Sequence, residues 1–108
     1  MGVPTVTVTL SLPLMDRLPQ TVSTPDGVSV SLDLYRKKDH TAAVVMCPGF
    51  FQSKDTATFQ RLSHALAGEN DVLAMDFRGH GRSTGLYTFS AREGVDLEAV
   101  LVWAGARY

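Results

Sequence analysis

The sequence predicts an α/β fold with amino-terminal antiparallel strands, a parallel βαβ unit and one further helix. Apolar and polar residues alternate in the first third of the chain, which is typical of half-buried strands. Two later apolar runs do not alternate, and residues at helical spacing separate them. The 108 residues form at most one domain. Its expected parts are antiparallel strands within 1–36, the βαβ unit at 42–77, a Gly-rich loop at 78–89 and a helix at 90–107.

The composition excludes several classes of partner. Ten Lys and Arg against eleven Asp and Glu leave a net charge of −1, so nothing electrostatic favours nucleic acid or an anionic membrane. No run of about 18 apolar residues is present, so we expect no membrane span. The single cysteine, Cys47, fits a reducing compartment, and no secretory leader is recognisable. We therefore expect a cytoplasmic protein.

Two strands are predicted in the first third. Even positions from Val6 to Leu14 are apolar and alternate with Thr and Ser, so one face is buried. The same pattern recurs from Val28 to Leu34, with Ser29, Ser31 and Asp33 facing outward. Pro25-Asp26-Gly27 supplies a turn before this second strand. Together these patterns favour an antiparallel sheet.

The βαβ unit begins at an apolar run, Ala42 to Cys47, which we expect to be a central parallel strand covered on both faces. Helical spacing follows, and Gly68 stands where a helix commonly ends. The apolar positions of this helix are Phe59, Leu62, Ala65 and Leu66. The second buried strand is expected at Asp71–Phe77.

The last predicted helix starts at a capping box. Ser90 and Glu93 have the spacing at which a hydroxyl and a carboxylate satisfy each other's backbone donors. One apolar stripe of this helix should pack on the sheet. Its members are Val95, Ala99, Val102, Trp103 and Ala106.

Ser83 lies in the only G-x-S-x-G pattern, but the context opposes a nucleophilic serine. A nucleophile elbow joins a strand directly to a helix, whereas the predicted strand ends at Phe77 and no helical period follows Ser83. Asp76, His80 and Ser83 are the residue types of a hydrolytic triad, yet they share one glycine-rich turn. We expect Asp76 and Ser83 to tie the loop and His80 to be solvated.

No cofactor or metal is expected. Gly79, Gly81 and Gly85 do not fit the dinucleotide frame, because its third glycine position holds Thr84. His40 and His64 have no second ligand at metal-binding spacing.

The loop after the first parallel strand is the best candidate site. It reads Cys47-Pro48-Gly49-Phe50-Phe51 and lies at the end of a strand where open α/β sheets bind ligands. Gly49 permits close approach, and the amides of Phe50 and Phe51 have the character of oxyanion-hole donors. A plain turn plugged by the two aromatic rings is an equal alternative. We expect Cys47 to pack as a small apolar residue.

Three segments together carry a family resemblance over residues 21 to 108. They are TPDGVSVSLDLYR, AAVVMCPGFFQS and DVLAMDFRGHGRSTG, followed by the amphipathic helix that ends in ARY. This pattern resembles the amino-terminal part of an α/β-hydrolase, of the esterase, lipase and serine-aminopeptidase-like branch. The most specific element is Asp76-x-Arg78-Gly79-x-Gly81-x-Ser83, which in that family is a structural loop near the active site.

The resemblance implies an oxyanion hole and a missing nucleophile. It assigns one backbone donor to Phe50, although Pro48 replaces the histidine that is common there. It also places the nucleophile, the acid and the catalytic histidine beyond Tyr108. The resemblance thus implies that residues 1–108 form an incomplete domain, the amino-terminal fragment of a serine hydrolase. The complete enzyme would act on small-molecule carboxylic esters, thioesters or amides and would need no cofactor. This chain contains no nucleophile and should have no activity alone.

Two other hypotheses for the function of the chain stay open. The chain can be a complete, non-catalytic α/β protein that binds a ligand or partner through the loop 48–53 and an exposed sheet edge. It can also be an autonomous hydrolase that uses Ser83, His80 and Asp76. In the hypothesis that the chain is a fragment, the strand at 42–47 is an unprotected sheet edge. We expect this edge to pair with the missing carboxyl-terminal half or with a second copy of the chain. Trp103 and Leu101 would then lose part of their cover.

Overall fold

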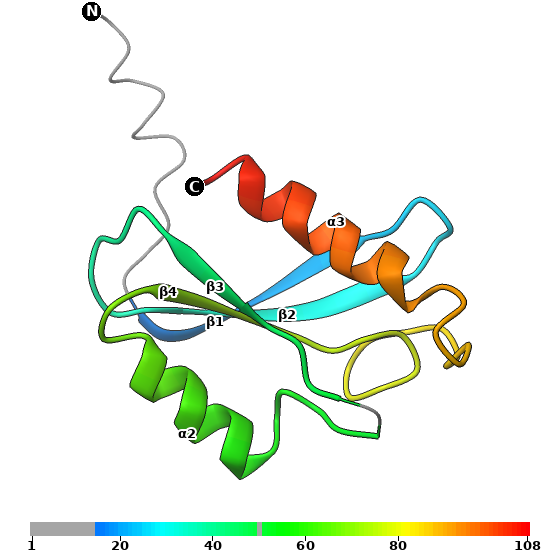
Figure 1. Cartoon of the computed structure of the whole chain (residues 1–108), viewed down its shortest axis with the longest axis horizontal. Coiled ribbons are helices and arrows are strands. Elements are labelled where there is room, and N and C mark those ends of the chain that lie inside the picture. The colour runs from blue at the N-terminus through cyan, green and yellow to red at the C-terminus, as the bar shows by residue number, and fades with distance from the viewer. Residues whose placement is uncertain (1–14, 50) are drawn as a thin grey trace, which may run out of the picture.

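Among the residues that the structure describes, the fold is a four-stranded mixed sheet with one helix on each face (Figure 1). The structure, a computed structural model, describes residues 15–49 and 51–108. The sheet order is β1-β2-β4-β3. The elements are β1 (Met15–Ser23), β2 (Ser29–Arg36), β3 (Ala43–Met46), α2 (Ala57–Leu66), β4 (Asp71–Met75) and α3 (Glu93–Gly105). The predicted strand Val6–Leu14 lies outside the described residues.

Strand β1 is an element that the sequence analysis did not predict. It pairs antiparallel with β2, and the register shifts between Met15 and Leu18. Leu18 and Val22 pack into the core from this strand. Pro19 interrupts the sequence pattern, but β1 is an edge strand of the described sheet, where a proline is tolerated.

Strand β2 confirms the alternation on one face and corrects it on the other. Val30, Leu32 and Leu34 are fully buried in the core beneath α3. Asp33 was expected to face solvent, but its exposure is only 2%. The expectation is wrong because Lys54 and Arg17 cover this carboxylate and form ion pairs with it.

Strand β4 is buried on both faces, as predicted. It pairs antiparallel with β2 and parallel with β3. Val72 and Ala74 join the core on the α2 side, whereas Leu73 and Met75 join the core on the α3 side. Two buried faces explain why this run does not alternate.

Strand β3 is an edge of the described sheet, as the fragment hypothesis expects, and not the central strand that its apolar run alone favoured. It pairs only with β4 among the described strands, and its first three residues are half-buried. Cys47, just after it, is exposed, so the prediction that this thiol packs inside is also wrong. The apolar sequence is suited to neighbours on both sides, but the described sheet supplies one.

Helix α2 has a side-chain cap at its N-terminus. The Thr56 side chain is its N-cap and accepts a hydrogen bond from the Phe59 amide. The helix ends at Leu66 with Ala67 as C-cap. Gly68 follows, but its backbone is not left-handed, so the glycine is not required there by conformation.

Helix α3 begins three residues later than expected and presents a different face to the sheet. Its N-cap is Arg92, not Ser90, and the Glu93 carboxylate bonds the amide and the hydroxyl of Thr88. Val100 is the fully buried apolar residue of α3, whereas the exposure of Val102 is 70%. The predicted stripe is wrong in part because apolar residues occur all around this helix, so their period does not select a face.

Candidate functional site

Two loops meet at the carboxyl ends of the parallel strands β3 and β4. One loop follows β3 and contains Gly49, and the other follows β4 and contains His80. A cavity of about 230 Å³ lies between them. Its lining residues are Pro48, Gly49, Phe77, His80, Tyr87, Ser90 and Glu93. This is the sheet end at which the sequence placed the candidate site.

The loop after β3 contains a tight turn. The Gln52 amide donates to the Gly49 carbonyl at 3.0 Å, which closes the turn. Phe51 has a φ of 59°, a left-handed conformation that is uncommon for a bulky residue. Phe50, the predicted oxyanion donor, lies outside the described residues. We refer to Gly49–Gln52 as the oxyanion turn, after its predicted role.

The Phe51 amide points toward the second loop. It donates a hydrogen bond to His80 Nε2 at 3.0 Å. The Phe51 side chain is 76% exposed, so it does not form the buried plug that the plain-turn alternative requires. The two loops are therefore joined by a backbone-to-imidazole contact.

His80 is half-buried, whereas the sequence analysis expected a solvated side chain. Its Nδ1 lies 3.0 Å from the Arg78 carbonyl oxygen, so both ring nitrogens have partners. The Tyr87 ring packs edge-on against the imidazole, with 5.4 Å between the ring centroids. The expectation failed because two of these partners, Phe51 and Tyr87, reach the imidazole only through the folding of the loops.

Asp76 is a fully buried acceptor that organises both loops. Its Oδ1 accepts the Lys54 amide at 2.8 Å, and its Oδ2 accepts the Arg82 amide at 3.2 Å. A Cβ on Gly81 would lie 2.1 Å from Asp76 Oδ2, and the φ of Gly81 is +50°. Only glycine fits at Gly81, because backbone and carboxylate approach so closely.

Lys54 is a buried cation that the sequence analysis missed. Its Nζ lies 3.4 Å from carboxylate oxygens of Asp33, Asp55 and Asp76. Arg17 adds a second positive charge, through contacts with Asp33 and Asp55. Burial raises the pKa of Asp55, but the charges of Lys54 and Arg17 prevail and lower it. No local pattern marks this cluster, because its members come from β1, β2 and two loops.

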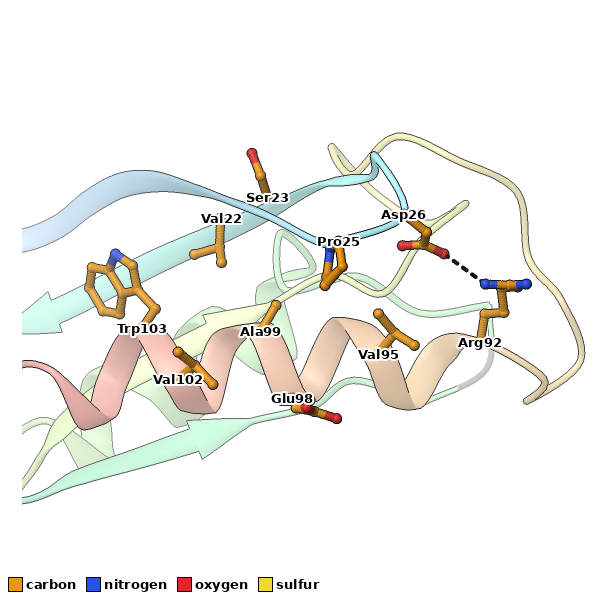
Figure 2. A pocket seen from close by; sticks show the side chains of 10 residues that line it. All are labelled: Val22, Ser23, Pro25, Asp26, Arg92, Val95, Glu98, Ala99, Val102 and Trp103. Atoms are coloured by element: carbon orange, nitrogen blue, oxygen red, sulfur yellow. Dashed lines mark hydrogen bonds and ion pairs between the residues drawn. The ribbon is translucent and has the colours of Figure 1, made fainter.

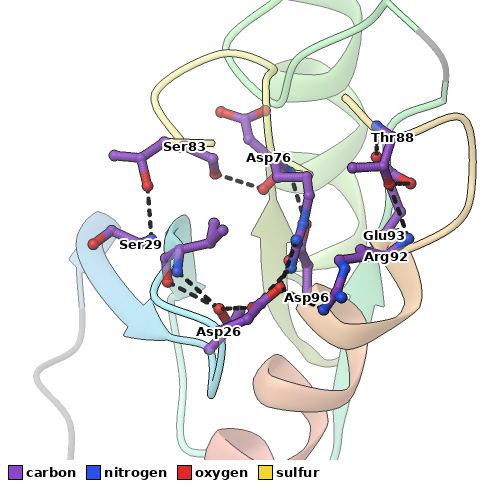
Figure 3. A network of polar contacts seen from close by, with 12 residues as sticks. Asp26, Ser29, Asp76, Ser83, Thr88, Arg92, Glu93 and Asp96 are labelled. Carbon is purple, nitrogen blue, oxygen red and sulfur yellow. Dashed lines mark hydrogen bonds and ion pairs between the residues drawn. The ribbon is translucent and has the colours of Figure 1, made fainter. Parts of the chain in front are cut away.

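The Ser83 hydroxyl bonds two backbone groups, and Figure 3 shows the bond to Asp76. Its hydroxyl donates to the Asp76 carbonyl oxygen at 2.6 Å and accepts the Ser31 amide at 2.8 Å. Thr84 makes two bonds with Ser29: its backbone amide donates to the Ser29 carbonyl oxygen, and its hydroxyl accepts the Ser29 amide. Hydrogen bonds thus hold the loop after β4 against strand β2.

Arg78 anchors the same loop from the opposite side. Its guanidinium bonds Asp96 of α3 and Asp26 of the turn between β1 and β2. Asp96 and Asp26 are labelled in Figure 3. Hydrogen bonds from Arg78 hold the pKa of Asp26 far below its usual range, and those of Asp26 and Asp96 raise the pKa of Arg78. Gly79, the next motif residue, has a φ of +75°, and a Cβ there would lie 2.5 Å from the Tyr87 amide nitrogen.

A second, larger hollow lies away from these loops (Figure 2). Its volume is about 530 Å³, and it separates α3 from the end of β1 and the turn that follows. Most of its lining side chains are apolar. The lining consists of Val22, Ser23, Pro25, Asp26, Arg92, Val95, Glu98, Ala99, Val102 and Trp103.

The described part of the chain shows neither a cluster of metal ligands nor a membrane-spanning helix. No group of three or more His, Cys, Asp or Glu side chains there is arranged to hold a metal ion. Within 15–49 and 51–108, no helix has the length and apolar character needed to cross a membrane.

Solved structures similar to this chain are α/β hydrolases. The esterase Pf2001 of Pyrococcus furiosus matches with a TM-score of 0.71 and 28% identity, over 94% of this chain and 39% of the esterase. GrgF, an α/β hydrolase of a Penicillium species, matches with a TM-score of 0.73 and 25% identity, over 86% of this chain and 32% of GrgF. XC6422 of Xanthomonas campestris, an a/b serine hydrolase without lid, has a TM-score of 0.68 and 24% identity, over 89% and 48%.

The mixed sheet with a helix on each face is therefore part of the α/β-hydrolase fold. The chain spans less than half the length of each of these three proteins. No family model matches the sequence, and no curated protein is significantly similar to it.

Proposed function

We propose that this chain is the amino-terminal part of a serine hydrolase for small-molecule carboxylic esters, thioesters or amides. It supplies the oxyanion turn and the sheet scaffold, and the attacking group is encoded elsewhere. The observation that carries the proposal is the position of the turn Gly49–Gln52, at the end of β3 beside the cavity that His80 lines. In open α/β sheets, ligands bind outside the carboxyl ends of the strands.

The oxyanion donor in this proposal is the amide of Phe50. Fixed backbone amides stabilise the negative charge of a tetrahedral intermediate without reorganising during the reaction. The Phe51 amide already donates to His80, which supports Phe50 over Phe51 as the donor. A Cβ on Gly49 would meet nothing within 4 Å, so space for a substrate is open at this position. Pro48 is buried and supplies no donor.

The hydrogen bonds of Ser83 support a nucleophile outside the chain. A nucleophilic serine needs a base within hydrogen-bond reach of its hydroxyl. The Ser83 hydroxyl instead bonds the Asp76 carbonyl and the Ser31 amide. The motif Asp76, Arg78, Gly79, Gly81 and Ser83 then serves as a structural loop, and the chain alone does not hydrolyse substrates. The reaction, an acyl transfer, needs no cofactor.

A non-catalytic binding protein is the second candidate, and the open edge of β3 favours it. An edge strand with half-buried apolar residues is a template for pairing with another strand. In the first proposal the missing carboxyl-terminal half of the hydrolase pairs there. In the second, a separate partner or another copy of the chain does so.

The coding DNA beyond Tyr108 separates the two candidates. The hydrolase proposal predicts an apolar strand that ends in G-x-S-x-G, then an acidic residue and a histidine. The longer protein, when expressed, should hydrolyse a p-nitrophenyl ester, and its activity should disappear when the serine of that motif is changed to Ala. The 108-residue chain should show no rate above background. A stop codon directly after Tyr108, together with a monomeric, inactive protein, would exclude the hydrolase proposal.

A further inference from the structure

We propose that His80 is a positioning residue, which fixes the oxyanion turn by accepting the Phe51 amide on a neutral imidazole. Its relevance to catalysis rests on the proposed function, whereas the contact itself does not. The Phe51 nitrogen lies 3.0 Å from His80 Nε2, and His80 Nδ1 lies 3.0 Å from the Arg78 carbonyl oxygen. The imidazole thus bridges the turn after β3 and the loop after β4.

The two partners select one tautomer. A carbonyl oxygen only accepts a hydrogen bond, so His80 Nδ1 must carry a proton toward Arg78. A backbone amide only donates, so His80 Nε2 must be unprotonated to accept from Phe51. Both bonds exist together only in the neutral ring with its proton on Nδ1.

The bond to His80 compensates for an unfavourable backbone at Phe51. A non-glycine residue in the left-handed region is strained, and it persists where its surroundings hold it. The turn has its own closing bond, from Gln52 to Gly49, but this bond does not attach it to the loop after β4. The hydrogen bond from Phe51 to His80 attaches the turn to that loop, together with contacts of the Phe51 ring with the rings of His80 and Tyr87.

Protonation of His80 breaks this attachment. The imidazolium carries a proton on Nε2, and this proton then faces the Phe51 N–H, so two donors oppose each other. The charged and titratable neighbours are Arg78, Tyr87 and Glu93. The Arg78 guanidinium is paired with Asp26 and Asp96, the Tyr87 ring packs edge-on, and Glu93 of α3 lines the same cavity while bonded to Thr88.

Nitrogen NMR of the 108-residue chain with ¹⁵N-labelled His tests the tautomer directly. We expect the His80 ring at neutral pH to show a protonated Nδ1, an unprotonated Nε2 and a scalar coupling from Nε2 to the Phe51 amide nitrogen. The coupling should vanish over the same pH range in which the ring becomes charged. A proton on Nε2 at neutral pH, or a Phe51 signal that does not follow the His80 titration, would overturn the proposal.

Two variants separate positioning from simple packing. The Gln side chain places a polar atom about where Nε2 lies, whereas the Asn side chain reaches only to about Nδ1. We expect amide hydrogen exchange at Phe51 to be about tenfold faster in His80→Asn, the effect of losing one hydrogen bond. His80→Gln should keep slow exchange, and the protection of the Phe51 amide relative to an unstructured chain should not fall on acidification, because the Gln side chain takes up no proton there. Equal exchange at Phe51 in the wild type and both variants would contradict the proposal.

The readout does not depend on catalysis. If the longer protein proves inactive while the tautomer and exchange results hold, the proposed function fails and the role of His80 in holding the turn stands. If the longer protein is active but its His80→Asn variant has an unchanged kcat, the positioning role in catalysis fails. In the active protein we expect His80→Asn to lower kcat more than it raises KM, because oxyanion donors act mainly in the transition state.

Discussion

Asp96 of α3 holds both the side chain and the backbone of Arg78. Its Oδ1 lies 2.7 Å from the terminal guanidinium nitrogen Nη2, and its Oδ2 accepts the Arg78 amide at 2.7 Å. Both side chains are buried. One carboxylate therefore couples α3 to the first residues of the loop that carries His80 and Ser83.

Loss of this carboxylate should destabilise the fold strongly. In Asp96→Asn the buried Arg78 guanidinium keeps only Asp26 as a charged partner, and we expect the free energy of unfolding to fall by about 3–5 kcal/mol. Urea denaturation measures the change. Arg92→Ala is the matched control, because Arg92 is 61% exposed and its distance to Asp26 is 3.5 Å, and it should cost about 0–1 kcal/mol. Equal effects of the two substitutions would contradict this assignment.

Substitution by alanine should lower the free energy of unfolding at Gly81 and raise it at Gly94. Gly81→Ala combines a left-handed backbone with a clash against the Asp76 carboxylate, so we expect a loss of about 3 kcal/mol or more. Gly94 lies in the first turn of α3, and a Cβ there meets nothing within 4 Å. Gly94→Ala should therefore stabilise by about 0.5–1 kcal/mol. Thermal unfolding of both variants checks the pair, and a stable Gly81→Ala variant would refute the close approach.

Glu93 should contribute to acid sensitivity. Burial tends to raise the pKa of Glu93, but hydrogen bonds from the Thr88 hydroxyl and backbone amides outweigh it and lower this pKa from 4.5 to about 2. Because the pKa is lower in the folded state, the stabilisation is fully present above pH 4.5 and is lost as the pH falls toward 2. Glu93→Gln should flatten the stability profile in this range, when urea unfolding is measured from pH 5 to pH 2.5. An unchanged acid slope in Glu93→Gln would show that other carboxylates determine it.

The open edge of β3 should drive self-association of the chain. Val44 is half-buried on this edge, and a lysine on an edge strand opposes pairing with another strand. We expect Val44→Lys to shift the sedimentation profile toward monomer. Thr21→Lys on β1 should not, because Pro19 and the register shift already interrupt that edge. A wild-type chain that sediments as a monomer at high concentration would contradict the prediction.

The regular elements of the fold could be predicted where local pattern and burial agree. Strand β4 reads as a doubly buried run, and its residues face cores on both sides. Strand β1 could not be predicted, because Pro19 and the charged Asp16 and Arg17 obscure its alternation. The start of α3 was misplaced because the carboxylate of Glu93 bonds Thr88, a choice made by loop geometry.

The position of the candidate site could be predicted, but its internal contacts could not. The end of a parallel strand marks the turn at Gly49 from sequence alone. The contact between Phe51 and His80 joins residues 29 positions apart, and the Lys54 cluster joins four segments. Such contacts depend on tertiary structure, for which neither hydrophobic period nor residue spacing gives a signal.

A fluorophosphonate probe, which labels activated serines covalently, tests most directly whether the nucleophile lies beyond Tyr108. The 108-residue chain and the protein extended by its downstream coding sequence are treated in parallel, and labelled peptides are identified by mass spectrometry. We expect no label on the 108-residue chain and a label on a serine beyond Tyr108 in the extended protein. A label on Ser83 that disappears in Ser83→Ala would contradict this expectation.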